Sequence, residues 1–218
     1  STSRTLSKGS TNFIYDGTTL TLLSNFRHGT NSTSGLNSYV QGRFTTASGN
    51  YSHAEGLGTV AAGVNSHAEG LSTITSTLGT YSHAEGSSTV TSGSYSHAEG
   101  ANTIARGLAS HAEGTFTIAS GSYSHAEGYF TIARENVSHA EGERTFAGGF
   151  ASHAAGLYTS TSGAYQSVIG QYNISSTNSG AFIIGNNGGI VKSAPKVFGW
   201  AFKTSPYNDK DYIELLQF

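Results

Sequence analysis

The pentapeptide Ser-His-Ala-Glu-Gly occurs seven times between residues 52 and 142, and an eighth copy at residues 152–156 has Ala in place of Glu. Successive copies are fourteen residues apart, except for one interval of sixteen between His67 and His83. A short and fixed period of this kind is typical of solenoids and related repeat architectures. Any fold of this chain therefore has to repeat once per unit.

One unit reads S-H-A-E-G-x-x-T, then an apolar or aromatic residue, then A/T-x-G-x and a second apolar or aromatic residue. Thr and the β-branched residue after it favour a strand, and Gly at the fifth and twelfth positions favours turns with positive φ. Fourteen residues are too few for a helix-turn-helix repeat. We therefore predict an all-β fold, a parallel β-roll or β-solenoid of 14-residue coils. In the long unit, we expect Thr77 and Leu78 in a turn, with Gly79 and Tyr81 resuming the pattern.

The alternation of side chains along a strand predicts which residues share a face. Ser, Ala and Gly of the pentapeptide should point inward, together with the column that contains Ile74, Ile104, Ile118 and Ile132. His and Glu should form two ladders on an outer face, with identical groups about 4.8 Å apart. The ladder residues are His53, His67, His83, His97, His111, His125 and His139, with Glu55, Glu69, Glu85, Glu99, Glu113, Glu127 and Glu141. Something should face these ladders, and a second copy of the chain is the simplest candidate.

The amino-acid composition limits the partners and the location that can be expected for this chain. Charged residues make up 11% of the chain, against about a quarter in ordinary proteins, and seven of the thirteen acidic residues are ladder Glu. Basic residues are sparse and scattered, so we expect no nucleic-acid partner. The sequence has no Cys and no apolar run long enough to cross a bilayer, so we expect no membrane insertion. A Gly-, Ser- and Thr-rich repeat fits an extracellular or virion setting, and the chain is expected to be part of a longer protein.

Two segments carry a family resemblance: Gln166-Ser167-Val168-Ile169-Gly170 and residues 181–185, Ala-Phe-Ile-Ile-Gly. They are similar to the Ser-Val-Ala-Ile-Gly coils in the heads of trimeric autotransporter adhesins. The Ser-His-Ala-Glu-Gly form resembles repeats in phage tail-fibre, tailspike and neck-appendage proteins. The resemblance covers roughly residues 38–190 and implies a left-handed parallel β-roll that assembles as an intertwined homotrimer.

This chain departs from the adhesin pattern, because His and Glu replace Val and Ile through seven coils. We therefore expect polar ladders, with His of one chain bonded to Glu of its neighbour. An apolar clamp between the chains is expected further on, at Val168, Ile169, Phe182, Ile183 and Ile184.

Three regions follow from this pattern. Residues 1–37 are expected to form an N-terminal hairpin around Asp16-Gly17 and a connection to an upstream shaft, with His28 outside the ladder. Residues 38–190 form the repeat domain, of about eleven coils. Residues 191–218 hold the only Trp and both Pro, and they are expected to cap the roll. Candidate binding residues in this cap are Trp200, Phe202, Tyr207 and Tyr212, although such aromatic residues are more often core.

Chemical motifs point away from catalysis. His and Glu ladders can hold zinc or nickel, but a periodic His on a strand is more often structural, so we expect no metal and no cofactor. His-Ala-Glu matches part of the zinc-deaminase motif, whose Cys ligands this chain lacks. Adjacent Ser and His point to opposite faces, and the uniform Glu do not mark one glycosidase site. The Thr-x-Thr array of an ice-binding surface is present at Thr73, Thr89 and Thr159 but is broken elsewhere.

The predicted function is a structural, receptor-binding segment of a trimeric fibre. A phage tail fibre or its tip, recognising a glycan or an outer protein of a bacterial surface, is the first candidate. The head domain of a bacterial trimeric surface adhesin is the alternative, and a polysaccharide-degrading tailspike is the third. The expected location is accordingly a virion tail fibre or an extracellular cell surface.

Overall fold

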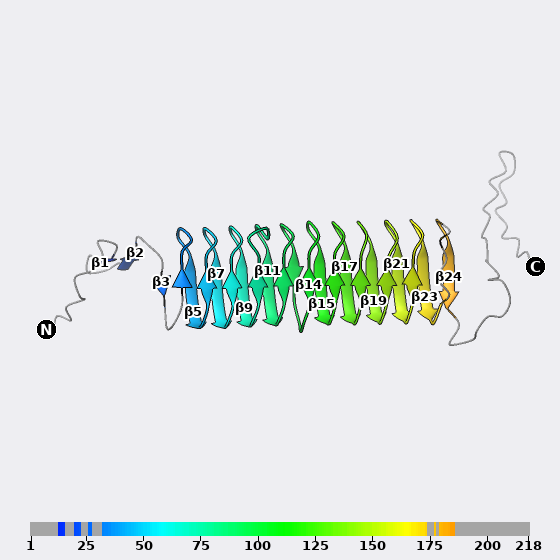
Figure 1. Ribbon diagram of the computed structural model, residues 1–218, viewed down its shortest axis with the longest axis horizontal. Coiled ribbons are helices and arrows are strands. Elements are labelled where there is room, and N and C mark those ends of the chain that lie inside the picture. Colours follow the sequence, from blue (N-terminus) through cyan, green and yellow to red (C-terminus); the bar gives the residue numbers. More distant parts are fainter. Residues whose placement is uncertain are drawn as a thin grey trace, which may run out of the picture.

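Most of the residues that the structure describes form one long β-solenoid, seen from the side in Figure 1. The computed structural model describes residues 32–173, 177 and 179–185, together with strands at 13–15, 20–22 and 26–27. None of these residues is helical. Each coil contributes one longer strand to a 12-stranded sheet and one two-residue strand to a 10-stranded sheet. This confirms the predicted all-β solenoid, with about 10 turns.

The longer strands and their neighbours at the two ends form the first sheet. They are β3 (Phe26–Arg27), β5 (Tyr39–Arg43), β7 (His53–Leu57), β9 (His67–Leu71), β11 (His83–Ser87), β13 (His97–Ala98), β15 (His111–Thr115), β17 (His125–Tyr129), β19 (His139–Glu143), β21 (His153–Leu157), β23 (Ser167–Gln171) and β24 (Phe182–Gly185). The second sheet contains β4 (Ser32–Thr33), β6 (Thr46–Ala47), β8 (Val60–Ala61), β10 (Ile74–Thr75), β12 (Val90–Thr91), β14 (Ile104–Ala105), β16 (Ile118–Ala119), β18 (Ile132–Ala133), β20 (Phe146–Ala147) and β22 (Ser160–Thr161).

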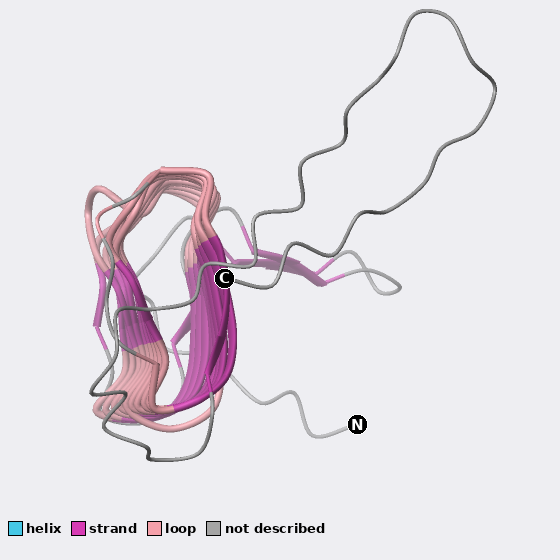
Figure 2. Cartoon of the chain, turned by 90° about the vertical axis from the view of Figure 1, so that its right-hand side faces the viewer, coloured by secondary structure: helices cyan, strands magenta, loops and turns pink. Residues whose placement is uncertain are grey.

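All pairs within both sheets are parallel, and equivalent residues of successive units are partners, such as His53 with His67 and Ile104 with Ile118. Viewed along the roll, the strands superimpose in two layers joined by turns at both ends (Figure 2). The pairing extends one coil before Tyr39, because β3 pairs with β5 and β4 pairs with β6. Part of residues 1–37, which the sequence assigns to a hairpin and a connection, therefore carries strands of the roll.

Strands β1 (Phe13–Tyr15) and β2 (Leu20–Leu22) pair antiparallel, in the register Phe13 to Leu22. This is the pairing that a hairpin around Asp16-Gly17 requires. The turn residues themselves lie outside the described residues.

The core of the roll consists of small side chains. Ser and Ala of the pentapeptide, Thr at the eighth position and Ala or Thr at the tenth are buried in every complete coil, and the core Ala residues have no exposed surface. The expected burial of the Ile column is wrong: Ile74 is 39% exposed, and Ile104, Ile118 and Ile132 are half-buried on the outer face. A coil of fourteen residues encloses too little space for Ile between its sheets, so the smaller Thr and Ala on either side point inward instead.

Ser and Gly close the turns. The Ser hydroxyl donates to the carbonyl of the residue three positions earlier, as from Ser96 to Gly93 at 2.6 Å and from Ser124 to Gly121 at 2.6 Å. The fifth-position Gly has positive φ as predicted, for example +102° at Gly114, but it is exposed or half-exposed and not part of the core. The twelfth-position Gly is not left-handed. It is required by close packing, since a Cβ on Gly107 would lie 1.9 Å from the carbonyl oxygen of Gly121.

The long unit follows the prediction. Thr77 and Leu78 lie in a turn, with Leu78 75% exposed, and Gly63 packs against the Gly79 backbone. Tyr81 resumes the corner conformation of the neighbouring coils, with φ of 57°. The two extra residues therefore bulge outward without shifting the register of the strands on either side.

Candidate functional site

The outer face of the longer strands carries the His and Glu columns. Parallel pairing in register places each His beside the His of the next coil and each Glu beside the next Glu. The imidazole rings form a continuous stack, in which centroids of neighbouring rings are 4.6 Å apart for His53 and His67 and 5.0 Å apart for His83 and His97. The stack extends to His153, the histidine of the variant repeat. The structure thus brings all predicted ladder residues onto one face.

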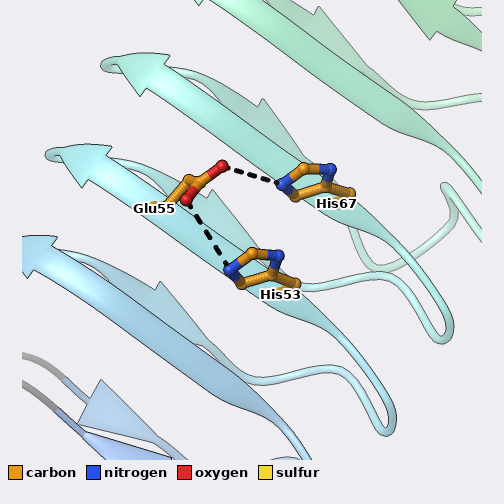
Figure 3. Close-up of side chains that lie close together, drawn as sticks. All are labelled: His53, Glu55 and His67. Atoms are coloured by element: carbon orange, nitrogen blue, oxygen red, sulfur yellow. Dashed lines mark ion pairs between the residues drawn. The ribbon is translucent and has the colours of Figure 1, made fainter.

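Each Glu lies against the His of the next coil, as Figure 3 shows for Glu55 between His53 and His67. The Glu55 carboxylate oxygens lie 3.9 Å from His53 Nε2 and 3.6 Å from His67 Nε2. The further Nε2 to Oε1 distances are 3.3 Å for His83 and Glu69, 3.2 Å for His97 and Glu85, 3.3 Å for His111 and Glu99, 3.4 Å for His125 and Glu113, 3.5 Å for His139 and Glu127, and 3.2 Å for His153 and Glu141.

His–Glu contacts therefore occur within one chain, and the pairing between chains that the sequence predicts stays a prediction. The physical reason is the strand spacing. Coils lie about 4.8 Å apart, so a Glu side chain that leans along the roll reaches the imidazole of the next coil. Each Glu carboxylate then lies beside an imidazole of the next coil, which separates the like-charged carboxylates of successive coils less than a second set of charges would but gives each a polar neighbour.

The ladder imidazoles are partly desolvated. In three of the contacts, those of His83, His97 and His153, Nε2 and the carboxylate oxygen also have hydrogen-bond geometry. In five others the Nε2 atom is buried and makes no hydrogen bond in the described part of the chain: His53, His67, His111, His125 and His139. These nitrogens have an ion-pair neighbour at 3.3 Å or more, but they lack an aligned donor or acceptor.

Burial and the stacked neighbours shift the pKa of several ladder groups. Burial, followed by the His97 imidazole, lowers the pKa of His83 below its usual 6.5. Burial and neighbouring imidazoles have the same effect on the pKa values of His53, His111 and His139. Burial, with the adjacent Glu55 and Glu85 carboxyls, raises the pKa of Glu69. The neutral imidazole is thus the favoured form of these four histidines at pH 7.

The ladder contains repeated sets of donor atoms. Among the described residues, His53, Glu55 and His67 place one ligand atom each within 4.8 Å of one another. Further sets of three with this property are His67–Glu69–His83, His83–Glu85–His97, His97–Glu99–His111 and Glu113–His125–Glu127. Each of these sets contains either two imidazoles and one carboxylate or one imidazole and two carboxylates, and such sets recur along the face.

The same face becomes apolar at its C-terminal end. Ala155, Ile169 and Ile184 continue the Glu column, and Ser167 and Phe182 continue the His column. Ile169, Phe182 and Ile184 are 36%, 44% and 66% exposed, and Ile183 is half-buried, so the clamp between chains stays a prediction for these residues. The expectation for Val168 is wrong: it occupies the Ala position of the pentapeptide, points into the core and has no exposed surface.

Sequence reasoning missed two columns of exposed corner residues. The seventh and fourteenth positions of the unit have left-handed backbone conformations, with φ of 58° at Tyr95 and 56° at Phe116, for example. Tyr recurs at the fourteenth position, where Tyr123 is 62% exposed, and the Tyr81 and Tyr95 rings stack at 5.1 Å. The recurrence of aromatic residues in the repeat was the signal, but turns with positive φ usually select Gly or Asn.

Trp200, Phe202, Tyr207 and Tyr212, the candidate binding residues of the tail, lie outside the described residues. In the part of the chain that the structure describes, no helix is long and apolar enough to span a bilayer. Comparison of the chain with protein-family models and with curated proteins gave no match.

Proposed function

We propose that this chain is a structural and receptor-binding segment of a trimeric fibre, most simply a phage tail fibre or tip that attaches to a bacterial surface. The supporting observation is the apolar end of the ladder face. Ile169, Phe182 and Ile184 follow one another along two adjacent columns and remain exposed in a single chain. Exposed apolar side chains that continue an extended flat face are suited to association with other copies of the same face.

The fold itself suits a fibre. About 10 coils at the strand spacing give a rod roughly 48 Å long, in which backbone hydrogen bonds run along the axis. The core consists mostly of small side chains, and the Ser-to-carbonyl turn bond recurs from Ser52 through Ser82 to Ser124. A rod of this kind transmits force and holds side chains at fixed intervals, which a spacer between a virion and its receptor needs.

The exposed aromatic corners supply a receptor-facing surface along the rod. Phe116 and Phe130 stack at 4.7 Å and Tyr158 and Tyr172 at 5.0 Å, in the column of the seventh position. Tyr95 and Tyr123 belong to the other corner column. Exposed aromatic rings with a polar rim bind the apolar faces of sugars, so a bacterial surface glycan is the proposed ligand class.

Assembly is tested by measuring the mass of the full chain by light scattering after size exclusion. The wild type is expected to have the mass of a trimer, and Ile169→Lys with Ile184→Lys should dissociate it. Ile118→Lys is the matched control, because Ile118 is half-buried on the outer face of the opposite sheet. A monomeric wild type, or dissociation by Ile118→Lys as well, would refute the proposed interface.

Attachment is tested with the labelled full chain and a panel of intact bacterial cells. The wild type should bind the cells of a host strain, and Tyr95→Ser with Tyr123→Ser should reduce this binding while the trimer mass stays unchanged. Binding by neither protein to any strain would contradict the receptor function. Equal binding by both would contradict the role of the aromatic corners.

A further inference from the structure

We propose that the His–Glu face is a linear array of binding sites for divalent transition-metal ions such as Zn²⁺ or Ni²⁺. Most of these sites combine the imidazole and carboxylate of one coil with the imidazole of the next, as in His53, Glu55 and His67, and the set Glu113–His125–Glu127 has one imidazole between two carboxylates. The proposal is independent of the fibre function, because each chain supplies all three donors itself. It also returns to an alternative that the sequence raised, on the basis of the geometry.

The donor set selects the class of ion. Imidazole nitrogen and carboxylate oxygen bind Zn²⁺, Ni²⁺ and Cu²⁺, whereas Mg²⁺ and Ca²⁺ prefer oxygen ligands throughout. The chain has no Cys, so the sites offer no soft thiolate ligand. Three protein donors leave the remaining coordination positions of the ion to water, an arrangement found in open zinc sites.

The distances fit such an ion with small movements. Ligand atoms about 2.05 Å from a tetrahedral metal lie roughly 3.4 Å from one another. The observed Nε2 to Oε1 distances of 3.3 Å for His83 and Glu69 and 3.2 Å for His97 and Glu85 already match this value. The two rings of a site are stacked at the strand spacing, 4.6 Å for His53 and His67, so rotation about the His side-chain bonds has to bring their nitrogens roughly 1 Å closer.

In the described coils, several ring nitrogens of the ladder lack a hydrogen-bond partner, whose place a metal ion could take. Nε2 of His53, His67, His111, His125 and His139 is buried from solvent and makes no hydrogen bond within the described residues. A buried imidazole nitrogen without a partner is costly, and coordination of a metal gives it one. The repetition of this feature in five coils distinguishes the face from an ordinary surface with scattered histidines.

Neighbouring sites compete for ligands. His67 belongs to the site with His53 and also to the site with His83, so an ion at one site removes a ligand from the next. Ions at adjacent coils would also repel each other. The sets His53–Glu55–His67, His83–Glu85–His97 and Glu113–His125–Glu127 share no residue. Binding is therefore expected to reach several ions per chain and to saturate well below one ion per coil.

The test is equilibrium dialysis of the metal-free full chain against micromolar Zn²⁺, with bound metal measured by elemental analysis. The wild type should bind several ions per chain in Zn²⁺ and none in Mg²⁺ at the same concentration. His83→Gln with His97→Gln should bind one ion fewer, since it removes a donor from three overlapping sets. His28→Gln is the matched control, because His28 is the one histidine outside the repeats, and it should bind as the wild type does.

A spectroscopic readout separates coordination from loose association. Co²⁺ in place of Zn²⁺ should give the visible absorption of a four- or five-coordinate nitrogen and oxygen site in the wild type, reduced in the double His variant and unchanged in His28→Gln. Circular dichroism without metal should show that all three proteins are folded. Absence of bound Zn²⁺ in the wild type, an equal loss in His28→Gln, or only six-coordinate aqueous Co²⁺ would overturn the proposal. Binding that persists in Ile169→Lys with Ile184→Lys would show that it does not depend on assembly.

Discussion

The buried Thr hydroxyls provide a sharp test of the core. Thr73 and Thr75 lie in the same coil, and both are fully buried. Thr75 Oγ1 shares a hydrogen bond of 2.7 Å with Ser66 Oγ, whereas Thr73 Oγ1 has no partner in the described part of the chain. Val has nearly the shape of Thr, so replacing each Thr by Val removes only the hydroxyl. The two substitutions should change the free energy of unfolding in opposite directions.

The expected magnitudes follow from the hydrogen bonding. A buried hydroxyl without a partner costs about 1–3 kcal/mol, so Thr73→Val should stabilise the fold by about 1 kcal/mol or more. Thr75→Val loses a hydrogen bond worth about 0.5–1.5 kcal/mol and should destabilise. Each kcal/mol corresponds to a shift of about 2–4 °C in the unfolding midpoint of a chain of this size.

The measurement is urea and thermal unfolding of both variants, followed by circular dichroism at the same protein concentration. Midpoints that move apart, upward for Thr73→Val and downward for Thr75→Val, confirm the hydrogen-bond assignment. If both variants are destabilised equally, the Thr73 hydroxyl has a partner and the reasoning fails. The pair Thr89 and Thr91 repeats the test one coil later, since Thr91 donates to Ser82 Oγ at 3.0 Å and Thr89 Oγ1 makes no hydrogen bond.

Three further predictions concern packing, the turn and pH. Gly107→Ala should destabilise the roll by about 3 kcal/mol or more in urea unfolding, because the new Cβ meets the Gly121 carbonyl oxygen, which belongs to the backbone. Gly58→Ala meets only a side-chain hydroxyl and should cost less, about 1–2 kcal/mol for its positive φ. Equal losses would exclude the packing role. Deletion of Thr77 and Leu78 restores a 14-residue coil and should change the free energy of unfolding by less than about 1 kcal/mol; loss of folding would contradict their position in an outward turn. In EDTA, the four ladder histidines with lowered pKa should contribute stability that is present above pH 6.5 and is lost as pH falls through their folded pKa values, since the unfolded chain takes up protons first. A midpoint that does not change between pH 7.5 and about pH 5 would contradict this assignment.

The sequence predicted those features that depend on the period alone. The repeat length gives the parallel pairing of equivalent residues, and alternation from Ser52 onward places Ser and Ala inside and His and Glu outside. The extra residues Thr77 and Leu78 were correctly placed in a turn, because a register shift would have broken the strand pairing on both sides.

Other features depend on the cross-section of the coil, which the period does not reveal. Ile104 has a strong tendency to be buried, but the interior is filled by Ala and Thr. Side-chain volume, and not hydrophobicity, therefore decides which residues of the short strand point into the core. Left-handed corners at Tyr95 and Phe116 contradict the usual preference for Gly. They are held by backbone bonds to the preceding coil, such as Tyr95 N–H to the Thr80 carbonyl at 2.8 Å. The contact of each ladder His with Glu of the preceding coil was not predicted, because diagonal contacts depend on how side chains lean between coils.

In this roll, the residues that hold the coil together and the residues that face solvent occupy different positions of the unit, so the outer residues can change without loss of the fold. Positions one, three, eight and ten of the unit hold small residues that are buried in the roll, and they change little from Ser52 to Thr161, whereas position twelve is Gly in most units and Glu135 in one. The outer positions vary without disturbing these contacts: the column that begins with Leu57 continues with Leu71, Ser87, Ala101, Thr115, Tyr129, Glu143 and Leu157. The His and Glu columns are an exception, since they are outward-facing and yet nearly invariant. The core does not require these two residues, and their repetition maintains the ring stack and the His–Glu contacts between coils, on which the proposed metal sites rest.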